Sequence, residues 1–374
     1  MSSQRKLRVG IIGAGEVSQV IHLPILAMLS HLYTISAICD VSQKNADHCA
    51  EKFHIPLSTV SADEVISSKD VDIVFVLTSD EFHETYTVAA LQAGKNVMLE
   101  KPITLSILSA VRIIEAERAA KGARVFVGYM RRYATSFTQA FKREVASIPK
   151  ILYARVRDFS GPNAQFVAQS GTFQVRNTDF PPEASKARTE KLNALFAEAF
   201  PNKEVTPERQ KYCRFLGSLG SHDISLMREI LGSPDSVAGV SVNEPFYTAI
   251  FNFRNKSGEP FAATYESGID RVPNFDAHLA VYGEDKRVHI SYPSPYVKGL
   301  PIVVKVDELN EFGEMTSREV LSSYEDAYTT ELQELYQCVV EGKEIKTTTE
   351  DALMDLKLYD EMYRKYDEGL SKQG

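Results

Sequence analysis

The stretch Val9-Gly-Ile-Ile-Gly-Ala-Gly-Glu-Val-Ser18, near the start of the chain, decides the fold. The apolar run Leu7–Ile12 that leads into it has the composition of a buried strand, and a helical stretch follows. Gly13 permits a tight turn between strand and helix, and Gly15 leaves room above the first helical amides, which attract anions. The stretch therefore predicts a strand–turn–helix unit.

The same alternation of strands and helices continues to about residue 127. Further strands are expected at Tyr33–Cys39, Ile73–Leu77, Asn96–Leu99 and Arg124–Val127, and helices at Lys44–Phe53, His83–Ala93 and Ser106–Ala120. Strands that alternate with helices at this spacing predict a parallel sheet with crossover helices. Residues 1–128 are therefore expected to form an α/β domain of the Rossmann type.

The pattern changes from about Ile151, where strands follow one another directly. We expect strands at Ile151–Arg157, Val237–Val242, Tyr247–Phe253, Phe261–Ser267, His278–Tyr282 and Arg287–Ser291, and helices near Ile224–Leu231, Ala327–Glu341 and Glu350–Tyr366. This predicts an α+β domain over residues 129–374, with an open, mostly antiparallel sheet. Its C-terminal helices are expected to pack back toward the first domain.

The stretch from about Ser160 to Gln210 is polar and irregular, with a possible helix at Lys186–Ala199. Long irregular segments in compact domains tend to be functional or disordered. This one could form a lid or line a substrate pocket, with Asn163 and Arg176 as contacts. It could equally be a peripheral excursion or an oligomer arm.

Composition excludes several classes of protein. The 374 residues carry a net charge of −8, with both signs interspersed, which argues against nucleic acid as a partner. No apolar run is long enough to span a membrane. The polar start does not look like a signal peptide, and no C-terminal targeting signal is evident, so a cytoplasmic location is expected. The four cysteines are too far apart to suggest a metal site or a disulfide framework: Cys39, Cys49, Cys213 and Cys338.

Asp40 stands at the end of the second expected strand. With the Gly13–Gly15 turn it completes most of a dinucleotide fingerprint, although Ser18 replaces the third glycine. A carboxylate there accepts hydrogen bonds from the adenosine ribose and repels a 2′-phosphate, which favours NAD over NADP. The alternative is that the glycines only form a turn and Asp40 only caps a helix.

Glu100-Lys-Pro102 ends an expected parallel strand. Ligands in open α/β sheets bind beyond the carboxyl ends of the strands. A lysine there could exchange a proton with a substrate hydroxyl. By composition alone, Lys101 would more often be an ordinary surface lysine.

These pieces together resemble the glucose–fructose oxidoreductase / inositol dehydrogenase / MocA family. The matching motifs occur in the family's order over nearly the whole chain: Gly10-Ile-Ile-Gly-Ala-Gly15, His22-Leu-Pro24, Thr78-Ser79 with His83, Glu100-Lys-Pro102, Gly128-Tyr-Met-Arg-Arg-Tyr133 and Gly217-Ser-Leu-Gly-Ser-His-Asp223. The resemblance implies a nicotinamide-dependent oxidoreductase with its active site in the cleft between the two domains.

The resemblance also implies roles for individual residues. Lys101 and His222 resemble the catalytic lysine and histidine of the family. The positions expected at the cofactor are Gly13, Gly15, Glu16, Val17, Asp40, Thr78, Ser79, His83, Glu100 and Lys101. Those expected on the substrate side are Tyr129, Arg131, Arg132, Asp158, Arg176 and Ser218. Two alternatives stay open: His222 could be a histidine that only satisfies a hydrogen-bond network, and the Tyr129–Arg132 stretch could be only a hinge.

One departure from the family pattern affects the expected chemistry. Many dehydrogenases of the family carry an aspartate four residues before the histidine, where this chain has Ser218, and the later acid of that helix is Ser225. Serine cannot be the partner carboxylate. Lys101 acting alone, His222 as base, or a contribution from Tyr129 or Asp158 are all open.

The expected reaction is hydride transfer between NAD and a hydroxyl or carbonyl of a sugar, cyclic polyol or sugar derivative. Two rivals use the same fold. One is a redox-neutral glycosidase or lyase that oxidises its substrate only transiently, and the other is a non-catalytic regulator that senses a dinucleotide. Members of the family often associate through the open sheet, so a homodimer or homotetramer is expected.

Overall fold

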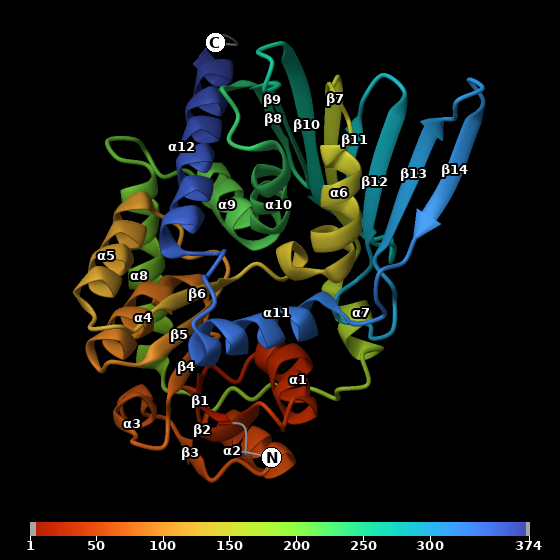
Figure 1. The fold of residues 1–374 in the computed structure, drawn as a ribbon. Coiled ribbons are helices and arrows are strands. Elements are labelled where there is room, and N and C mark those ends of the chain that lie inside the picture. Colours follow the sequence, from red (N-terminus) through yellow and green to blue (C-terminus); the bar gives the residue numbers. More distant parts are fainter. Residues whose placement is uncertain (1–4, 372–374) are drawn as a thin grey trace. The chain divides into compact units, whose positions relative to one another are not determined.

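The computed structural model describes residues 5–371 (Figure 1). Residues 1–4 and 372–374 lie outside the described residues. The expectation that the chain carries no signal peptide and no C-terminal targeting signal rests partly on them. The described chain forms two compact units, which are taken in turn. The first comprises residues 5–129, 171–217 and 331–356, and the second comprises 130–170, 218–330 and 357–371. The predicted division into domains between residues 128 and 129 stays a prediction.

The first unit contains a six-stranded parallel sheet in the order β3-β2-β1-β4-β5-β6. Its strands are β1 (Leu7–Ile12), β2 (Tyr33–Cys39), β3 (Leu57–Thr59), β4 (Ile73–Val76), β5 (Asn96–Glu100) and β6 (Val125–Gly128). Every residue of β4 and β6 is buried, as expected of strands covered on both faces. The order reverses between β1 and β4, and in such sheets ligands bind at that point. The predicted Rossmann fold is confirmed.

Helices connect these strands, and several begin at a serine cap. They are η1 (Ser18–His22), α1 (Leu23–Met28), α2 (Gln43–Phe53), α3 (Ala62–Ser67), η2 (Asp80–Phe82), α4 (His83–Gln92) and α5 (Ile107–Ala119). The hydroxyls of Ser42, Ser61 and Ser106 accept a backbone amide at the starts of α2, α3 and α5. The short strand β3 was not predicted, because three residues carry too little periodicity.

The stretch expected to be irregular is mostly helical. It holds α7 (Asn163–Ala168) in the second unit and α8 (Pro182–Ala199) in the first, and α9 (Pro207–Phe215) follows. Pro182 and Pro207 each stand in the first turn of their helix, where a missing amide costs nothing. Within the first unit, α8 packs against η2 and α5, and α4 packs against α5 (Figure 1).

The second unit contains an eight-stranded sheet in the order β14-β13-β12-β11-β7-β10-β9-β8. Its strands are β7 (Tyr153–Ser160), β8 (Ser236–Asn243), β9 (Phe246–Arg254), β10 (Pro260–Ile269), β11 (Asp276–Tyr282), β12 (Lys286–Tyr292), β13 (Val303–Leu309) and β14 (Met315–Val320). Only β7 and β10 pair in parallel, so the predicted mostly antiparallel sheet is confirmed.

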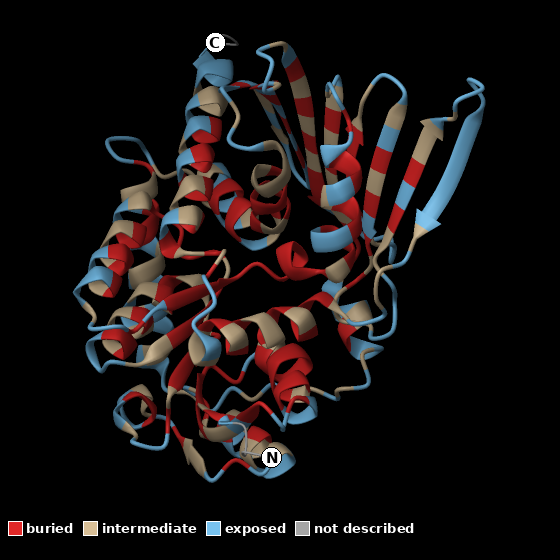
Figure 2. Cartoon of the chain, viewed as in Figure 1, coloured by how far each residue is buried: buried red, intermediate tan, exposed pale blue. Residues whose placement is uncertain are grey.

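One face of this sheet is covered and the other is not. Along β9 buried and exposed residues alternate strictly. The covering elements include η4 (Ser136–Phe141) and α10 (Ser221–Leu231). The edge strand β14 has five exposed residues and no buried one, and it appears almost wholly pale blue in Figure 2. Its sequence predicted no strand because it has no apolar face.

The remaining elements are short or C-terminal: η3 (Met130–Tyr133), α6 (Lys142–Ala146), η5 (Leu216–Gly220), α11 (Ala327–Tyr336), η6 (Gln337–Glu341) and α12 (Thr349–Ser371). Two long-range bonds join the part of α11 from Glu331 onward to the rest of the first unit. The Tyr33 hydroxyl donates to the carbonyl of Leu332 at 2.6 Å, and the Tyr336 hydroxyl donates to the carbonyl of Arg5 at 2.6 Å. Within residues 5–371, none of the helices is both long and apolar enough to cross a bilayer.

Candidate functional site

The glycine turn lies between β1 and η1 and has the expected conformations. Gly13 has a φ of +106°, and its amide donates to the carbonyl of Cys39 at 2.8 Å. A methyl group on Gly13 would lie 2.6 Å from the carbonyl oxygen of Leu77, so no larger residue fits without a shift. At Gly15 a methyl group would meet nothing within 4 Å, because this residue faces open space.

Asp40 links this turn to the next strand. Its carboxylate accepts the amide of Ala14 at 2.7 Å on Oδ2 and the amide of Ser42 at 2.9 Å on Oδ1. Asp40 therefore does hold the local backbone, as the alternative reading of the sequence proposed. Each carboxylate oxygen retains a second lone pair, and the side chain is half-buried at a pocket. The two readings of Asp40 are compatible.

A pocket of about 460 Å³ opens above the reversal point of the sheet, entirely within the first unit. Predicted positions in its lining are Gly13, Gly15, Asp40, Thr78 and Ser79. The other lining residues are mostly apolar: Ile12, Cys39, Val41, Val60, Leu77, Phe82, Tyr86, Phe180, Ala184, Ser185, Ala187 and Arg188. A mostly apolar pocket that is also lined by an acid and a glycine turn suits the adenosine half of a dinucleotide.

The loop after β4 contributes Thr78, Ser79 and His83. The Thr78 hydroxyl oxygen is buried without a hydrogen-bond partner among the described residues, so a ligand could satisfy it. Ser79 donates to Glu81 at 2.8 Å. The ring nitrogens of His83 lie 3.1 Å from the carbonyl of Thr78 and 2.8 Å from that of Pro102. His83 thus ties the loop after β4 to the segment after β5.

Glu100, at the end of β5, is buried against His22. The His22 Nε2 lies 2.7 Å from Glu100 Oε1, and the amide of Lys101 donates to Oε2 at 3.2 Å. Burial acts to raise the pKa of Glu100, but the hydrogen bond from His22 prevails and lowers it below its ordinary value. The residues on either side of Lys101 are therefore held by two histidines, His22 and His83, which fixes the backbone that carries the half-buried Lys101.

Sequence reasoning missed Asp80, the first residue of η2. Burial raises the pKa of Asp80, while the charges of His83 and Lys101 act to lower it. A methyl group on Gly217 would lie 3.8 Å from its Oδ2, so the η5 backbone approaches this carboxyl group closely. An acid directly after the Thr78-Ser79 pair was the only signal in the sequence. It places a carboxyl group in the electrostatic surroundings of Lys101.

The segment from residue 171 adds contacts to the glycine turn. Gln19 exchanges two hydrogen bonds with the backbone of Val175, at 2.9 and 3.0 Å. Arg176, expected on the substrate side, pairs with Glu16, which was expected at the cofactor. The structure places Arg176 beside the glycine turn. Val17, also expected at the cofactor, caps the N-terminus of η1.

The second unit holds most of the positions expected on the substrate side. Arg131 is buried between Asp158, at 2.7 Å, and Asp223 in the first turn of α10. Burial disfavours the charge, but the two carboxylates raise the pKa of Arg131 above its ordinary value. Because His222 precedes Asp223, this pair anchors the helix turn that carries His222.

Other expected positions of that side are spread over several elements. Arg132 pairs with Glu229 of α10, and Ser218 lies in η5. Asn163 donates to the Tyr296 hydroxyl at 3.3 Å within the second unit. Tyr129 is buried at the end of β6. Lys101 and Tyr129 belong to the first unit and His222 to the second.

Comparisons with known proteins agree with this geometry. Residues 7–129 match the model of an oxidoreductase family with an NAD-binding Rossmann fold, and residues 201–371 match the family's C-terminal alpha/beta domain. An inositol 2-dehydrogenase of Paracoccus denitrificans is 34% identical over 157 residues, which are 41% of this chain and 46% of that protein. The chain thus aligns with less than half the length of that relative.

Two further relatives cover nearly the whole chain. A myo-inositol 2-dehydrogenase of Thermotoga maritima is 25% identical over 357 residues, 94% of each protein. A levoglucosan dehydrogenase, solved with NADH and levoglucosan, has a TM-score of 0.74 at 16% identity, over 97% of this chain and 98% of that one. The latter likeness is one of fold. On its two matched parts, this chain belongs to the glucose–fructose oxidoreductase / inositol dehydrogenase / MocA family of oxidoreductases, with an NAD-binding Rossmann fold.

Proposed function

We propose that this chain is an NAD-dependent dehydrogenase that oxidises a CH–OH group of a sugar, cyclic polyol or sugar derivative. The observation that carries the proposal is the pocket above Gly13, Gly15 and Asp40, in the same unit as the Lys101 segment. Relatives named as inositol dehydrogenases and a levoglucosan dehydrogenase support this substrate class.

The residues of the first unit fit the dinucleotide. Gly15 would allow the pyrophosphate to approach the η1 amides, Asp40 would accept the ribose hydroxyls, and Thr78 would bond the cofactor through its buried hydroxyl. The bound nicotinamide supplies the site that accepts or returns hydride.

Lys101 is proposed to exchange the proton of the substrate hydroxyl. Its backbone is fixed by the His22–Glu100 bond on one side and the His83–Pro102 contact on the other. Fixed geometry matters because small displacements of a reacting group cost rate. His222 is proposed as a substrate contact or second proton carrier, held in place through the neighbouring Asp223 and its bond to Arg131. Because Lys101 and His222 are both proposed to exchange protons, the reaction needs no carboxylate at the position of Ser218.

Self-association is proposed through the uncovered face of the eight-stranded sheet. On that face Arg155 and Arg157 of β7 both pair with Glu266 of β10, at 2.9 and 2.7 Å. A charge-paired sheet face of this kind can contact an identical face across a two-fold axis. Light scattering after size exclusion should give twice or four times the mass of one chain, and a monomer at micromolar concentration would contradict the proposal.

The test is formation of NADH by the purified protein with inositols, aldoses, sugar acids and anhydrosugars. Turnover with one of these classes supports a dehydrogenase. In K101A we expect turnover to fall by about a thousandfold, the scale of a lost proton-transfer group, while NADH still binds. The control is K69A, which removes an exposed lysine. Near-normal turnover of K101A would remove Lys101 from the mechanism.

Product analysis distinguishes the dehydrogenase from the two alternatives, a redox-neutral glycosidase or lyase and a non-catalytic regulator. Cleavage of a glycoside without net NADH formation would establish the redox-neutral reaction instead. Tight NADH binding with no reaction of any substrate would favour a sensor of dinucleotides.

A further inference from the structure

We propose that Asp179 is a second determinant of cofactor choice, which acts with Asp40 to select NAD over NADP. The inference rests on the proposed function, in which the pocket holds a nicotinamide dinucleotide. Asp179 lies between the matched ranges 7–129 and 201–371, in a part of the chain that neither family model covers. It is therefore a feature of this chain's own connecting segment.

Asp179 contacts the turn that joins β2 to α2. Its Oδ1 accepts the hydroxyl of Ser42, and its Oδ2 accepts the amide of Lys44 at 3.2 Å. The same Ser42 oxygen accepts the amide of Asn45 at 3.1 Å as the cap of α2. The carboxylate of Asp179 thus lies at the N-terminus of α2, two to four residues beyond Asp40.

The carboxylate of Asp179 is well stabilised as an anion. The hydrogen bond from Ser42 lowers the pKa of Asp179 below its ordinary value, with a smaller contribution from the charge of Lys44. A helix N-terminus also favours negative charge. Asp179 is therefore ionised at neutral pH, and it offsets the nearby positive charge of Lys44.

This placement bears on the one group that distinguishes NADP from NAD. A 2′-phosphate on the ribose held by Asp40 would project toward the residues that follow β2, where Val41 lines the pocket. Two of the donors there are the Ser42 hydroxyl and the Lys44 amide, and Asp179 already occupies both. The phosphate would find these two donors occupied and would meet a second carboxylate, which also offsets the charge of Lys44. Rejection by occupied donors and like charge is a recognised route to specificity.

The segment that carries Asp179 is anchored on both sides of the pocket. On the α2 side, Asn177 donates to Asn45 at 2.9 Å. On the η2 side, Arg188 of α8 donates to Glu81 at 2.6 Å. Phe180 and Ala184 between these anchors line the pocket wall. The position of Asp179 is therefore set by contacts that do not involve its own carboxylate, so neutralising it should leave the segment in place.

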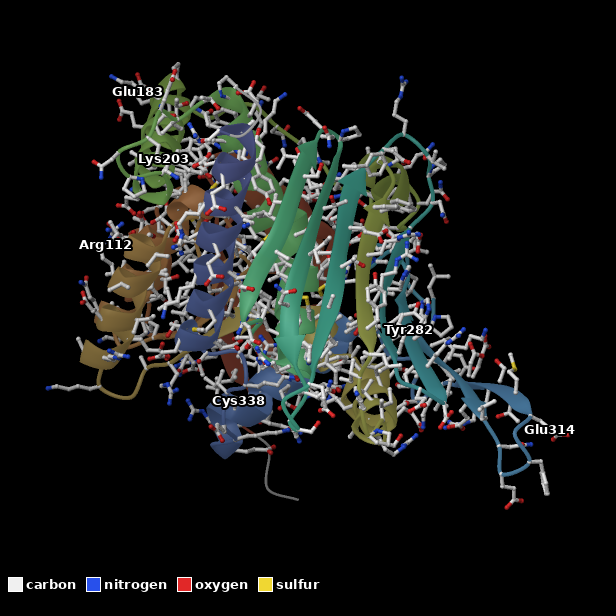
Figure 3. All side chains as sticks on the ribbon, turned by 90° about the horizontal axis from the view of Figure 1, so that it is seen from above. Arg112, Glu183, Lys203, Tyr282, Glu314 and Cys338 are labelled. Atoms are coloured by element: carbon white, nitrogen blue, oxygen red, sulfur yellow. The ribbon has the colours of Figure 1, made fainter. Side chains whose placement is uncertain are left out.

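The experiment is to titrate the full chain with NADH and with NADPH and to measure binding by the fluorescence of the nucleotide. The proteins compared are wild type, D179N, D179K and D40N. We expect D179N to bind NADPH roughly tenfold more tightly, the scale of removing one unit charge from near a phosphate. NADH affinity should change less than about threefold on the same argument, since NADH lacks that phosphate. D179K should favour NADPH further. E183Q removes an exposed carboxylate from the first turn of α8 and is the matched control (Figure 3).

Several outcomes would overturn the proposal. An unchanged ratio of NADPH to NADH affinity in both D179N and D179K would do so, with Asp40 left as the sole determinant if D40N shifts the ratio. A loss of NADH affinity in D179N without a gain for NADPH would make Asp179 a ribose ligand instead. Wild type that binds neither nucleotide would remove the proposed function as well. Binding of NADH with no turnover of any substrate would remove only the dehydrogenase activity, because this readout needs no substrate.

Discussion

The imidazole Nε2 of His22 lies 2.7 Å from Oε1 of Glu100, and both side chains are buried in the first unit. One residue ends η1 and the other ends β5, so the bond joins the glycine-turn helix to the strand that precedes Lys101. A carboxylate can only accept, and the lowered pKa of Glu100 means that His22 donates. The His22-Leu-Pro24 and Glu100-Lys-Pro102 motifs of the sequence are thus joined in the structure.

Removing His22 should destabilise the protein. H22A leaves the Glu100 charge buried without its main donor, and the free energy of unfolding should fall by about 3 kcal/mol. Urea unfolding measures this, with H31A, at an exposed position, as the control. A loss below about 0.5 kcal/mol, the range of an ordinary surface substitution, would show that the bond does not stabilise the native state.

The stability conferred by Glu100 should depend on pH with a defined sign. Because folding lowers the pKa of Glu100, its contribution is present above pH 4.5, the ordinary pKa of a glutamate. It is lost as the pH falls through the lower native pKa. The difference in unfolding free energy between wild type and E100Q should therefore be constant from pH 5 to 7 and shrink in stronger acid. A difference that grows on acidification would contradict this.

The two glycines of the turn should respond differently to a methyl group. G13A meets the Leu77 carbonyl at 2.6 Å and adopts a φ that alanine disfavours, so stability should fall by about 2 kcal/mol. G15A meets nothing in the protein and should melt like wild type, but its methyl group intrudes where the pyrophosphate is proposed to lie. We expect NADH affinity of G15A to fall at least about tenfold. Calorimetric melting and NADH titration give the two readouts, and G15A with wild-type affinity would move the pyrophosphate elsewhere.

The sequence allowed the fold to be predicted where periodicity and turn chemistry agree. The apolar runs of β1, β4 and β6 and the turn at Gly13 identify a Rossmann sheet without further information, and the alternation in β9 identifies a half-covered sheet. Strand β14 was not predicted, because an exposed edge strand needs no apolar residues and so leaves no periodic pattern in the sequence.

The candidate site was less accessible to prediction than the fold. The Gly13, Asp40 and Lys101 positions follow from local motifs. Asp179 and Asp80 do not, because their surroundings are set by contacts across the fold that no local pattern encodes, such as the bond from Ser42 to Asp179 over 137 positions of sequence. The assignment of Arg176 to the substrate side rested on its position in the sequence and stays a prediction, and no local pattern indicated its ion pair with Glu16.

The buried pairing of Arg131 predicts a large effect in the second unit. R131M removes the buried charge that pairs with both Asp158 and Asp223, and the free energy of unfolding should fall by about 3–5 kcal/mol. The triple variant R131M/D158N/D223N removes all three charges and should recover part of that loss. R271M, at an exposed arginine, is the control for the substitution itself. If the triple variant is no more stable than R131M, uncompensated charge is not the cause of the loss.

Replacement of Asp80 should raise the stability of the protein and lower its activity. Burial raises its pKa, so the native state holds a proton more tightly than the unfolded chain. Stability from this group is then full below pH 3.8 and is lost as the pH rises through the raised native pKa. At pH 7 the D80N variant, which carries no charge to bury, should be more stable than wild type by about 1 kcal/mol.

The same D80N variant should lose activity. The carboxyl group lies in the electrostatic surroundings of Lys101 and His83, and the proposed proton exchange depends on how Lys101 is held. We expect kcat to fall roughly tenfold to a hundredfold with a small change in NADH affinity. The pH profile of kcat should also shift, which a purely structural residue would not cause. D63N, at an exposed aspartate in the first turn of α3, should change neither quantity. A D80N enzyme that is more stable and equally active across the pH range would show that Asp80 has no part in positioning Lys101.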